Sequence, residues 1–564
     1  MKSQPPLPRT AARKHTHLGI FTACSLAYVA SLFMLMLFAP AGTVHAQEWI
    51  YTVRPGDNLW DFSEEYLTDI RYWKRLQQIN DIQRPRNMPP GSKIKVPIAW
   101  LKVQPEPARV LQISGTAELV RAGSEQSDAL SIDHELRTGD RIRTAADSNV
   151  TLRFADDSEL LIQSDSEVIM DTLSSYHRTG MVDTRVRLQQ GRVDTRVKPS
   201  QGPGSRYHII TPAAVAAVRG TNFRVSTETD QPVSRSEVIE GKVKVSGDIG
   251  AQLVPAGYGV VAEKGKPTAP PKELLPAPEA SGMPDVFQRL PLAFAWNGVD
   301  GAQGYRFQIA DHSQFSTLLA DRETTAPSGL WHDLPDGDYF LRLRAVDDDK
   351  LEGWNGDYAF SVDARPFPPF LVEPKDNITL RDARPTLSWS EPEDARKYRV
   401  QLASDPEFAT LLHDDIQGTA ARFSPGQPLV VGRYYWRIAS IDTSGEQGPY
   451  SDIHQFEYRA IPPSPDFKAP EVGKDELVIQ WQSAGEQVQY QFQMAEDPEF
   501  EQITLDKVIG EPRVAMRRPI PETYYFRART IDSDGYEGEF GPAQKLTVQP
   551  TSFWSLLIPL ILLF

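Results

Sequence analysis

Apolar and polar residues alternate over short stretches along most of this chain, which is the period of a β-strand with one buried face. Between residues 110 and 261 the alternating runs are close together and turn residues separate them; they include 150–154, 159–162, 167–170, 192–197 and 242–245. This pattern predicts an all-β domain of many short strands, built either as a sandwich or as a stacked β-roll.

A threefold repeat of about 90 residues follows this domain. Trp296, Trp389 and Trp481 are 93 and 92 residues apart, and Tyr305, Tyr398 and Tyr490 follow them at nine residues each. Each tyrosine opens an alternating strand, and a second aromatic strand recurs later in each repeat. We predict three β-sandwich repeats at 291–365, 366–462 and 463–550, with the tryptophans and tyrosines in their cores; a binding surface lined by these residues is the alternative.

One segment near the N-terminal end has a helical period instead. A short alternating run at 51–53 ends at Gly56-Asp57, and apolar positions then recur at i, i+3, i+4 and i+7 from Leu59 to Tyr66. A second helical stretch covers 73–80, and Pro89-Pro90-Gly91 precedes the alternating run 93–96. The order predicts strand, helix, helix, strand, with Asp57 as the N-cap of the first helix.

These landmarks resemble the LysM family, a small βααβ module. The resemblance covers residues 47–104 and implies binding of the N-acetylglucosamine-containing glycan of peptidoglycan and chitin, in a shallow groove between two loops. Carried over to this chain, one lip comprises Gly56, Asp57, Asn58 and Leu59, and the other comprises Asn87, Met88 and Pro90. Asn58 stands where the family usually has threonine. We interpret Trp60, Trp73 and Asn80 as core or turn-stabilising residues.

The β-domain, expected at 105–265, resembles the FecR-type periplasmic domain. The resemblance is carried by 136–144, 154–158, 210–225 and 238–245, and its most specific element is Val218-Arg219-Gly220-Thr221. Well-known members sense an outer-membrane receptor and signal through the membrane to a sigma factor. Only 17 residues precede the apolar run of this chain, too few for their cytoplasmic domain. We interpret Arg219, Gly220 and Thr221 as a structural turn, with an interaction site as the alternative.

The three repeats resemble fibronectin type III domains. Two stretches between the domains are expected to be connecting chain: Gln104-Pro105-Glu106-Pro107 as a short linker, and 266–290 as a proline-rich spacer. The fold class predicted for the whole chain is therefore multi-domain and mainly β, with one small βααβ module.

The two ends of the chain differ from the rest in composition. Residues 1–46 combine a basic start, an apolar run and a Val-x-Ala46 site, which predicts an export signal cleaved before Gln47. An uncleaved inner-membrane anchor is the alternative. The sole cysteine, Cys24, lies in that run, so the exported protein cannot form disulfides. The tail at 551–564 is apolar but too short and proline-broken to span a bilayer; contact with a membrane face and docking on a partner both remain open.

Charge and motif content narrow the functional classes. The net charge of −15 disfavours nucleic acid as a partner. No His-Glu-x-x-His, nucleophile elbow, P-loop or dinucleotide motif is present, and we expect no enzyme activity, metal or cofactor. The run Asp347-Asp348-Asp349 is interpreted as a solvated turn rather than a calcium site. The sequence thus predicts a periplasmic, peptidoglycan-binding scaffold that offers β-domains to envelope proteins, with a FecR-like sensor as the alternative and a wall-remodelling enzyme third.

Overall fold

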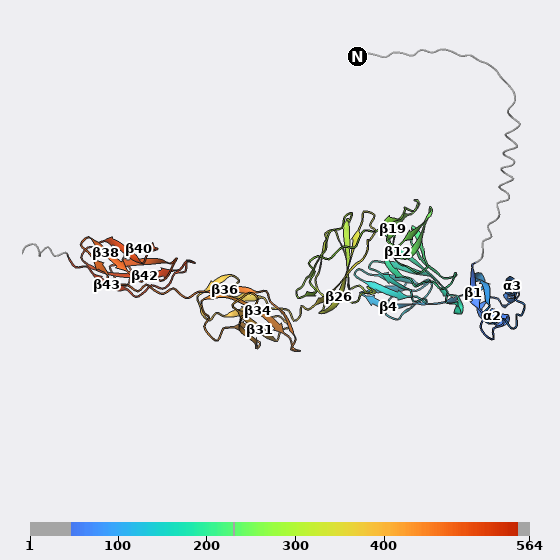
Figure 1. Cartoon of the computed structure of the whole chain (residues 1–564), viewed down its shortest axis with the longest axis horizontal. Helices are drawn as coiled ribbons and strands as arrows, with labels where there is room; N and C mark the ends of the chain where they lie inside the picture. The colour runs from blue at the N-terminus through green and yellow to red at the C-terminus, as the bar shows by residue number, and fades with distance from the viewer. Residues whose placement is uncertain (1–46, 229–231, 551–564) are drawn as a thin grey trace, which may run out of the picture. The chain divides into compact units, whose positions relative to one another are not determined.

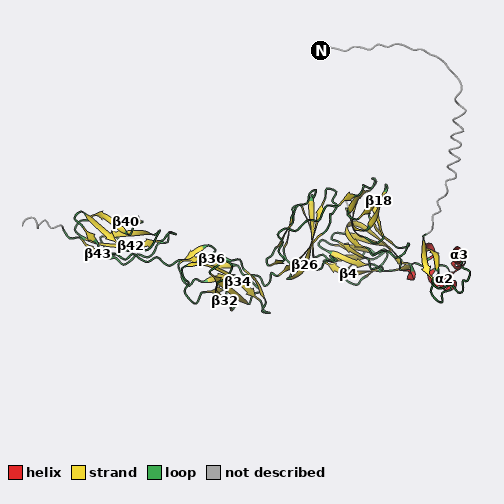
Figure 2. Ribbon diagram, viewed as in Figure 1, coloured by secondary structure: helices red, strands yellow, loops and turns green. Residues whose placement is uncertain are grey.

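The computed structural model describes residues 47–228 and 232–550, and these are organised mainly as β-strands (Figures 1 and 2). They form two compact units. The first contains residues up to 283 together with 293–331 and 339–359, and the second contains 284–292, 332–338 and the residues from 360 onward. The predicted signal (1–46) and the apolar tail (551–564) lie outside the described residues. Within the described residues, no helix is long and apolar enough to cross a membrane.

The N-terminal module has the predicted strand, helix, helix, strand order, and its helices α2 and α3 are labelled in Figure 2. Its elements are β1 (Glu48–Thr52), α2 (Leu59–Tyr66), η2 (Ile70–Tyr72), α3 (Trp73–Ile79), β2 (Lys93–Pro97) and η3 (Ile98–Trp100). Strands β1 and β2 pair antiparallel, and the face of α2 expected to be apolar is buried against them. Two expectations were wrong in detail. The N-cap of α2 is Asn58, whose Oδ1 accepts a hydrogen bond from the Asp61 N–H at 2.9 Å, and Trp60 is 53% exposed rather than in the core.

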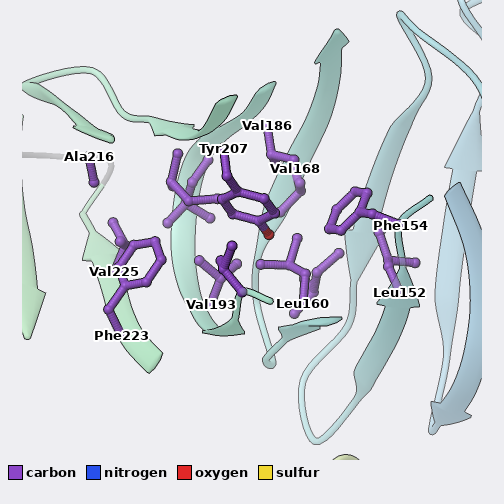
Figure 3. Packing of buried hydrophobic residues seen from close by; sticks show 14 of the residues in the cluster. Leu152, Phe154, Leu160, Val168, Val186, Val193, Tyr207, Ala216, Phe223 and Val225 are labelled. Atoms are coloured by element: carbon purple, nitrogen blue, oxygen red, sulfur yellow. The ribbon is translucent and has the colours of Figure 1, made fainter. Parts of the chain in front are cut away.

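The following β-domain consists of two sheets that share one long strand, β12 (Val182–Arg196). The first half of β12 pairs with β11 and β13, and its second half pairs with β10 and β15. Gly191 lies where the strand passes from one sheet to the other, with φ +91° and no room for a side chain beside Ser166. A single apolar core fills the space between the sheets (Figure 3).

The other elements of this domain follow the two sheets. The first sheet contains β3 (Gln104–Pro105), β5 (Ala117–Val120), β6 (Ser127–Ala129), β8 (Arg141–Thr144), β11 (Glu167–Ser175), β13 (Arg206–Ile210), β14 (Ala214–Val218), β17 (Lys242–Gly247) and β18 (Ala251–Pro255). The second contains β4 (Ala108–Ser114), β7 (Glu135–Leu136), β9 (Asn149–Arg153), β10 (Glu159–Ile162), β15 (Asn222–Thr227), β16 (Val233–Glu240), β19 (Tyr258–Glu263) and β20 (Lys272–Glu273). A short helix, η4 (His177–Thr179), joins β11 to β12.

The three repeats are β-structures with the predicted cores. The first contains β21 (Val286–Phe287), β22 (Leu292–Ala295), β23 (Gly304–Ala310), β24 (Ala320–Thr324), β25 (Ser328–Trp331), β26 (Gly337–Val346) and β27 (Gly356–Val362). The second contains β28 (Leu371–Glu373), β29 (Ile378–Leu380), β30 (Leu387–Trp389), β31 (Lys397–Ala403), β32 (Leu411–Gln417), β33 (Arg422–Phe423), β34 (Gly432–Ile441), β35 (Gln447–Tyr450) and β36 (His454–Tyr458). The third contains β37 (Glu471–Val472), β38 (Glu476–Gln480), β39 (Gln489–Ala495), β40 (Ile503–Ile509), β41 (Arg513–Arg517), β42 (Thr523–Ile531) and β43 (Gln544–Thr547).

The repeated tryptophan is a core residue in all three repeats, as predicted. Trp296, Trp389 and Trp481 are 3%, 4% and 2% exposed. Each ring meets the tyrosine nine residues later edge-on, at centroid distances of 5.6, 5.4 and 5.3 Å, a favoured geometry for aromatic pairs.

The segments expected to be free connecting chain are packed instead. Gln104–Pro105 forms β3 and pairs with Ser174 and Ser175 of β11. In the proline-rich segment, Leu274 is buried, the Leu275 carbonyl accepts a hydrogen bond from Trp354 N–H at 2.9 Å, and the Pro278 carbonyl accepts one from the Tyr358 hydroxyl at 2.7 Å. Up to residue 283 this segment is therefore a seam within the first unit. The proline-rich composition predicts extended chain, but it does not indicate that this chain packs against the first repeat.

Candidate functional site

The two loops expected to form the lips of a groove lie next to each other in the N-terminal module. The Leu59 N–H donates to the Pro85 carbonyl at 2.8 Å, which links the start of α2 to the loop that leads into β2. Gly56 has φ +94° and Gly91 has φ +83°, so each lip contains a turn that favours glycine. A Cβ on either residue would meet nothing within 4 Å, so the surface beside both turns is open.

The polar side chains of the first lip form hydrogen bonds within the lip itself. Asp57 Oδ2 accepts hydrogen bonds from the Tyr51 hydroxyl and from the Arg54 N–H, both at 2.7 Å. Burial and this contact with Asp57 raise the pKa of Tyr51 well above its usual value, so the phenol remains a donor. Asn58 caps α2 through Asp61, and its Nδ2 also donates to Asp61 Oδ2 at 2.6 Å. These contacts hold the lip in one conformation.

The remaining lip residues divide into exposed and buried groups. Gly56, Asn87 and Pro90 are exposed, whereas Leu59 is 0% and Met88 is 2% exposed. Leu59 and Met88 are therefore inaccessible from the surface, so they shape the two lips rather than contact a ligand. Asn87 offers the exposed polar side chain of the second lip.

Asn80 and the rest of the module support this arrangement. Asn80 Nδ2 donates to the Lys95 carbonyl at 2.9 Å and its Oδ1 accepts from the Lys95 N–H at 2.6 Å, which ties the end of α3 to β2. This is the turn-stabilising role predicted for it. Trp73 is half-buried and lies beside Trp60, with ring centroids 6.4 Å apart.

The module is joined to the β-domain at the other end of α2. Tyr176 and Met181, from the connection between β11 and β12, complete its apolar core. Arg178 pairs with Glu65 at 3.2 Å. Glu65 and the lip residue Leu59 are six residues apart on one helix, or roughly 10 Å. The joint therefore leaves the lips uncovered by these contacts.

The turn at 219–221 connects β14 of the first sheet to β15 of the second. Gly220 has φ +96°, and a Cβ there would lie 2.7 Å from Pro199 Cα, so glycine is required by both conformation and space. Thr221 is 5% exposed and its carbonyl accepts from the Val197 N–H at 2.9 Å. Arg219 is exposed, and its Nη2 donates to the Pro203 carbonyl at 3.3 Å. These contacts favour the structural interpretation of Gly220 and Thr221.

A buried ionic cluster joins the second sheet of the β-domain to the first repeat. Glu352 Oε2 contacts Arg344 Nη1 at 2.7 Å, and its Oε1 contacts Arg306 and also Arg192. Arg344 reaches back to Asp194 at 3.0 Å, and its side chain is 1% exposed. The cluster thus combines residues from β12 with residues from β23 and β26.

Arg224 and Glu237 extend the cluster into β15 and β16. Arg224 Nη2 donates to the carbonyls of Glu352 and Gly353 at 2.8 and 2.9 Å. Burial lowers the pKa of Arg224 to about 10. Burial and the nearby Glu352 carboxylate raise the pKa of Glu237 to about 7, against the opposing effect of Arg224, whose Nε is 3.9 Å away. Burial alone would raise the pKa of Glu352 too, but Arg306, Arg192 and Arg344 hold it well below its usual range.

The negative charges of Asp347, Asp348 and Asp349 in the first repeat are balanced in part by one lysine. Lys272 Nζ lies 2.8, 2.6 and 2.7 Å from carboxylate oxygens of Asp347, Asp348 and Asp349. The ammonium therefore takes the place among these carboxylates that a cation would need, and it fastens the proline-rich segment to the repeat.

None of the cluster residues was singled out from the sequence. Arg192, Asp194 and Arg224 occupy outward positions of alternating strands, which normally indicates solvent. Alternation distinguishes the two faces of a sheet, but it carries no signal that a neighbouring domain covers the outer one.

The pH dependence of this cluster can be predicted. The folded pKa of Glu237, about 7 against an ordinary 4.5, means that the folded state binds this proton more tightly. The contribution of Glu237 to stability should therefore fall as pH rises from about 4.5 to 7, by on the order of 3 kcal/mol, and stay level above that. Glu237→Gln should remove this decline and make the protein more stable than wild type at pH 8. Urea unfolding of both proteins between pH 5 and 8 measures this, and parallel curves would contradict it.

Two regions of the chain match known protein families. Residues 51–97 match the LysM domain family, and residues 140–244 match the family described as FecR protein. The chain carries a LysM domain and a FecR-type domain. LysM domains bind peptidoglycan and other N-acetylglucosamine-containing glycans, and both kinds of domain are binding or regulatory modules rather than catalysts. Both fit a protein of the bacterial envelope.

Whole-chain similarity is limited. An uncharacterized protein of Deinococcus radiodurans is 38% identical over 48 residues, which is 8% of this chain and 19% of the relative. Two structures of a proposed anti-sigma factor from Parabacteroides distasonis are 14% identical, with a TM-score of 0.21, and cover 24% of this chain and 59% of theirs. The FN1–FN3 domains of chicken CNTN1 are 14% identical with a TM-score of 0.22, covering 49% of this chain and 98% of theirs. Likeness at this level carries no functional argument.

Proposed function

We propose that this protein is a non-catalytic scaffold of the bacterial envelope that holds peptidoglycan glycan through its LysM domain and offers β-domains to protein partners. The observation that carries the proposal is the pair of LysM lips, linked by the Leu59–Pro85 hydrogen bond and left uncovered by the joint at the other end of α2. The lip contacts of Asp57 and Asn58 favour a preformed groove, which lowers the ordering cost of binding.

The LysM domain would act as part of the first compact unit. Its core is completed by the FecR-type domain, which in turn is joined to the first repeat by the buried ionic cluster. A glycan held at the lips would therefore fix the position of the whole first unit on the wall. The second and third repeats, in the other unit, are the surfaces proposed for envelope partners.

Glycan binding is tested most directly at Asn87. Asn87→Ala removes an exposed polar side chain from the second lip and should weaken binding to purified sacculi about five- to tenfold, with an unchanged melting temperature. Wild-type affinity for a single shallow groove should lie in the micromolar to millimolar range, roughly −4 to −8 kcal/mol. Co-sedimentation of the intact protein with sacculi, competed by soluble chito-oligosaccharide, measures both.

The control for this variant is Gln78→Ala, which removes another exposed amide, from α3. It should sediment like wild type. If both variants sediment equally, Asn87 does not belong to the binding site. If the wild-type protein does not bind sacculi, the proposed function is wrong. Met88→Ala is unsuitable as a probe because the side chain is buried and its loss should cost about 2 to 5 kcal/mol of stability.

A FecR-like sensor is the second candidate, and the match of residues 140–244 is the observation that favours it. A sensor would need to stay coupled to the inner membrane. Recovery of the protein with an intact Met1 in the membrane fraction would favour the sensor, whereas a start at Gln47 in the periplasm would favour the scaffold.

A further inference from the structure

Trp60 is a large aromatic side chain that the LysM fold leaves exposed. It lies in the first turn of α2, whose buried residues are Leu59, Phe62, Ser63 and Tyr66, and it is 53% exposed. Its ring contacts the half-buried ring of Trp73 at 6.4 Å with an interplanar angle of 58°. Burial of an indole is among the largest single contributions to a core. Because Trp60 is about half exposed, much of this stabilisation by burial is absent, and the ring face is available to a ligand.

The position of Trp60 continues the proposed groove. It directly follows Asn58 and Leu59, which belong to the first lip, and the Leu59 N–H is bonded to the Pro85 carbonyl of the second loop. Consecutive Cα atoms are about 3.8 Å apart, so the indole starts directly beside the first lip. Trp73, with the Lys74 ammonium 5.7 Å from its ring centroid, supports the indole from α3.

The surroundings of the indole favour a sugar over a protein surface. The other exposed residues of the two helices are mostly charged or polar: Asp61 and Glu64 on α2, and Lys74, Arg75 and Gln78 on α3, with Ile79 as the one apolar exception. A stable protein interface needs a contiguous patch of several hundred Å² on each partner, with an apolar centre. A pyranose ring needs only one flat apolar face for its C–H bonds, with polar groups around it for its hydroxyls.

We propose that Trp60, supported by Trp73, forms an additional sugar subsite at the end of the LysM groove. The occupant is the next N-acetylglucosamine-type ring of a glycan chain that already fills the groove, stacked on the indole face. This inference rests on the proposed glycan binding. It adds that affinity grows with glycan length because of one named side chain.

The test compares N-acetylglucosamine oligomers of increasing length, titrated calorimetrically into the intact protein. Wild type should gain affinity as the oligomer grows beyond the groove. Trp60→Ala should bind the shortest detectable oligomer like wild type but bind long oligomers about tenfold more weakly, which corresponds to about 1.4 kcal/mol. Trp60→Phe should retain most of the gain, because an aromatic face remains. Melting temperatures should not change, since the side chain contributes little to the core.

The matched control is Ile79→Ala, which removes another apolar side chain, 46% exposed, from α3. It should leave all affinities unchanged. Trp60→Ala binding of every oligomer like wild type would overturn the subsite while the groove stands, provided that Asn87→Ala still weakens binding. An equal loss for short and long oligomers would also overturn it, since Trp60 would then belong to the groove itself. Failure of wild type to bind any oligomer would instead refute the proposed function, and the subsite with it.

Discussion

Replacing Arg344 by alanine should destabilise the first unit by about 3 to 5 kcal/mol, because the variant leaves the buried Glu352 and the partly buried Asp194 with fewer cations. The Arg344 side chain is 1% exposed and donates to Asn355, Glu352 and Asp194, so its removal breaks contacts on both sides of the joint between the FecR-type domain and the first repeat. Urea unfolding of the intact protein measures the loss. Protease cleavage within 267–283, the seam that crosses this joint, should become faster.

The third repeat provides a matched control for this experiment. Arg529 occupies on β42 the position that Arg344 has on β26, since it pairs across from Gln491 as Arg344 pairs across from Arg306. Its ion pair with Glu537 is more exposed, at 22% and 52%. Arg529→Ala should therefore cost no more than about 1 kcal/mol. Similar losses for the two variants would mean that burial does not distinguish the two ion pairs.

Replacing Trp389 by alanine should destabilise the second repeat by about 3 to 5 kcal/mol, since the side chain is 4% exposed and packs edge-on against Tyr398. A loss of this size is a large fraction of the roughly 5 to 15 kcal/mol that holds a domain folded. Hydrogen exchange of the intact protein, followed by peptide, should show faster exchange across 366–462. Exchange across 463–550 reports whether the third repeat depends on the second.

Phe370→Ala is the control in the same repeat. This side chain is 82% exposed, so its removal should change stability by less than about 0.5 kcal/mol. If Trp389→Ala exchanges like Phe370→Ala, the tryptophan contributes little to the core, and a role at the surface would have to be considered.

The backbone of the LysM domain was predicted more closely from the sequence than its side chains were. The glycine turns at Gly56 and Gly91 and the buried face of α2 follow from local rules, namely positive φ and helical period. The cap was placed one residue early, because Asp57 and Asn58 are both good capping residues and sequence alone does not choose between them. Trp60 was expected to pack in the core because aromatic residues usually do, but its position in the first turn of α2 points it away from the buried face.

The sequence by itself determined that the chain is multi-domain and mainly β, with one small helical module and a repeated core tryptophan, because strand alternation, helical period and the spacing of Trp296, Trp389 and Trp481 depend on each module alone. Only the tertiary structure decided which outward charges are solvated and which are buried. Arg344 and Arg529 occupy equivalent strand positions, yet one is in a buried cluster and the other in an exposed pair. The physical reason is that periodicity records how a strand faces its own core, whereas burial of its outer face depends on a second domain whose position no local pattern encodes.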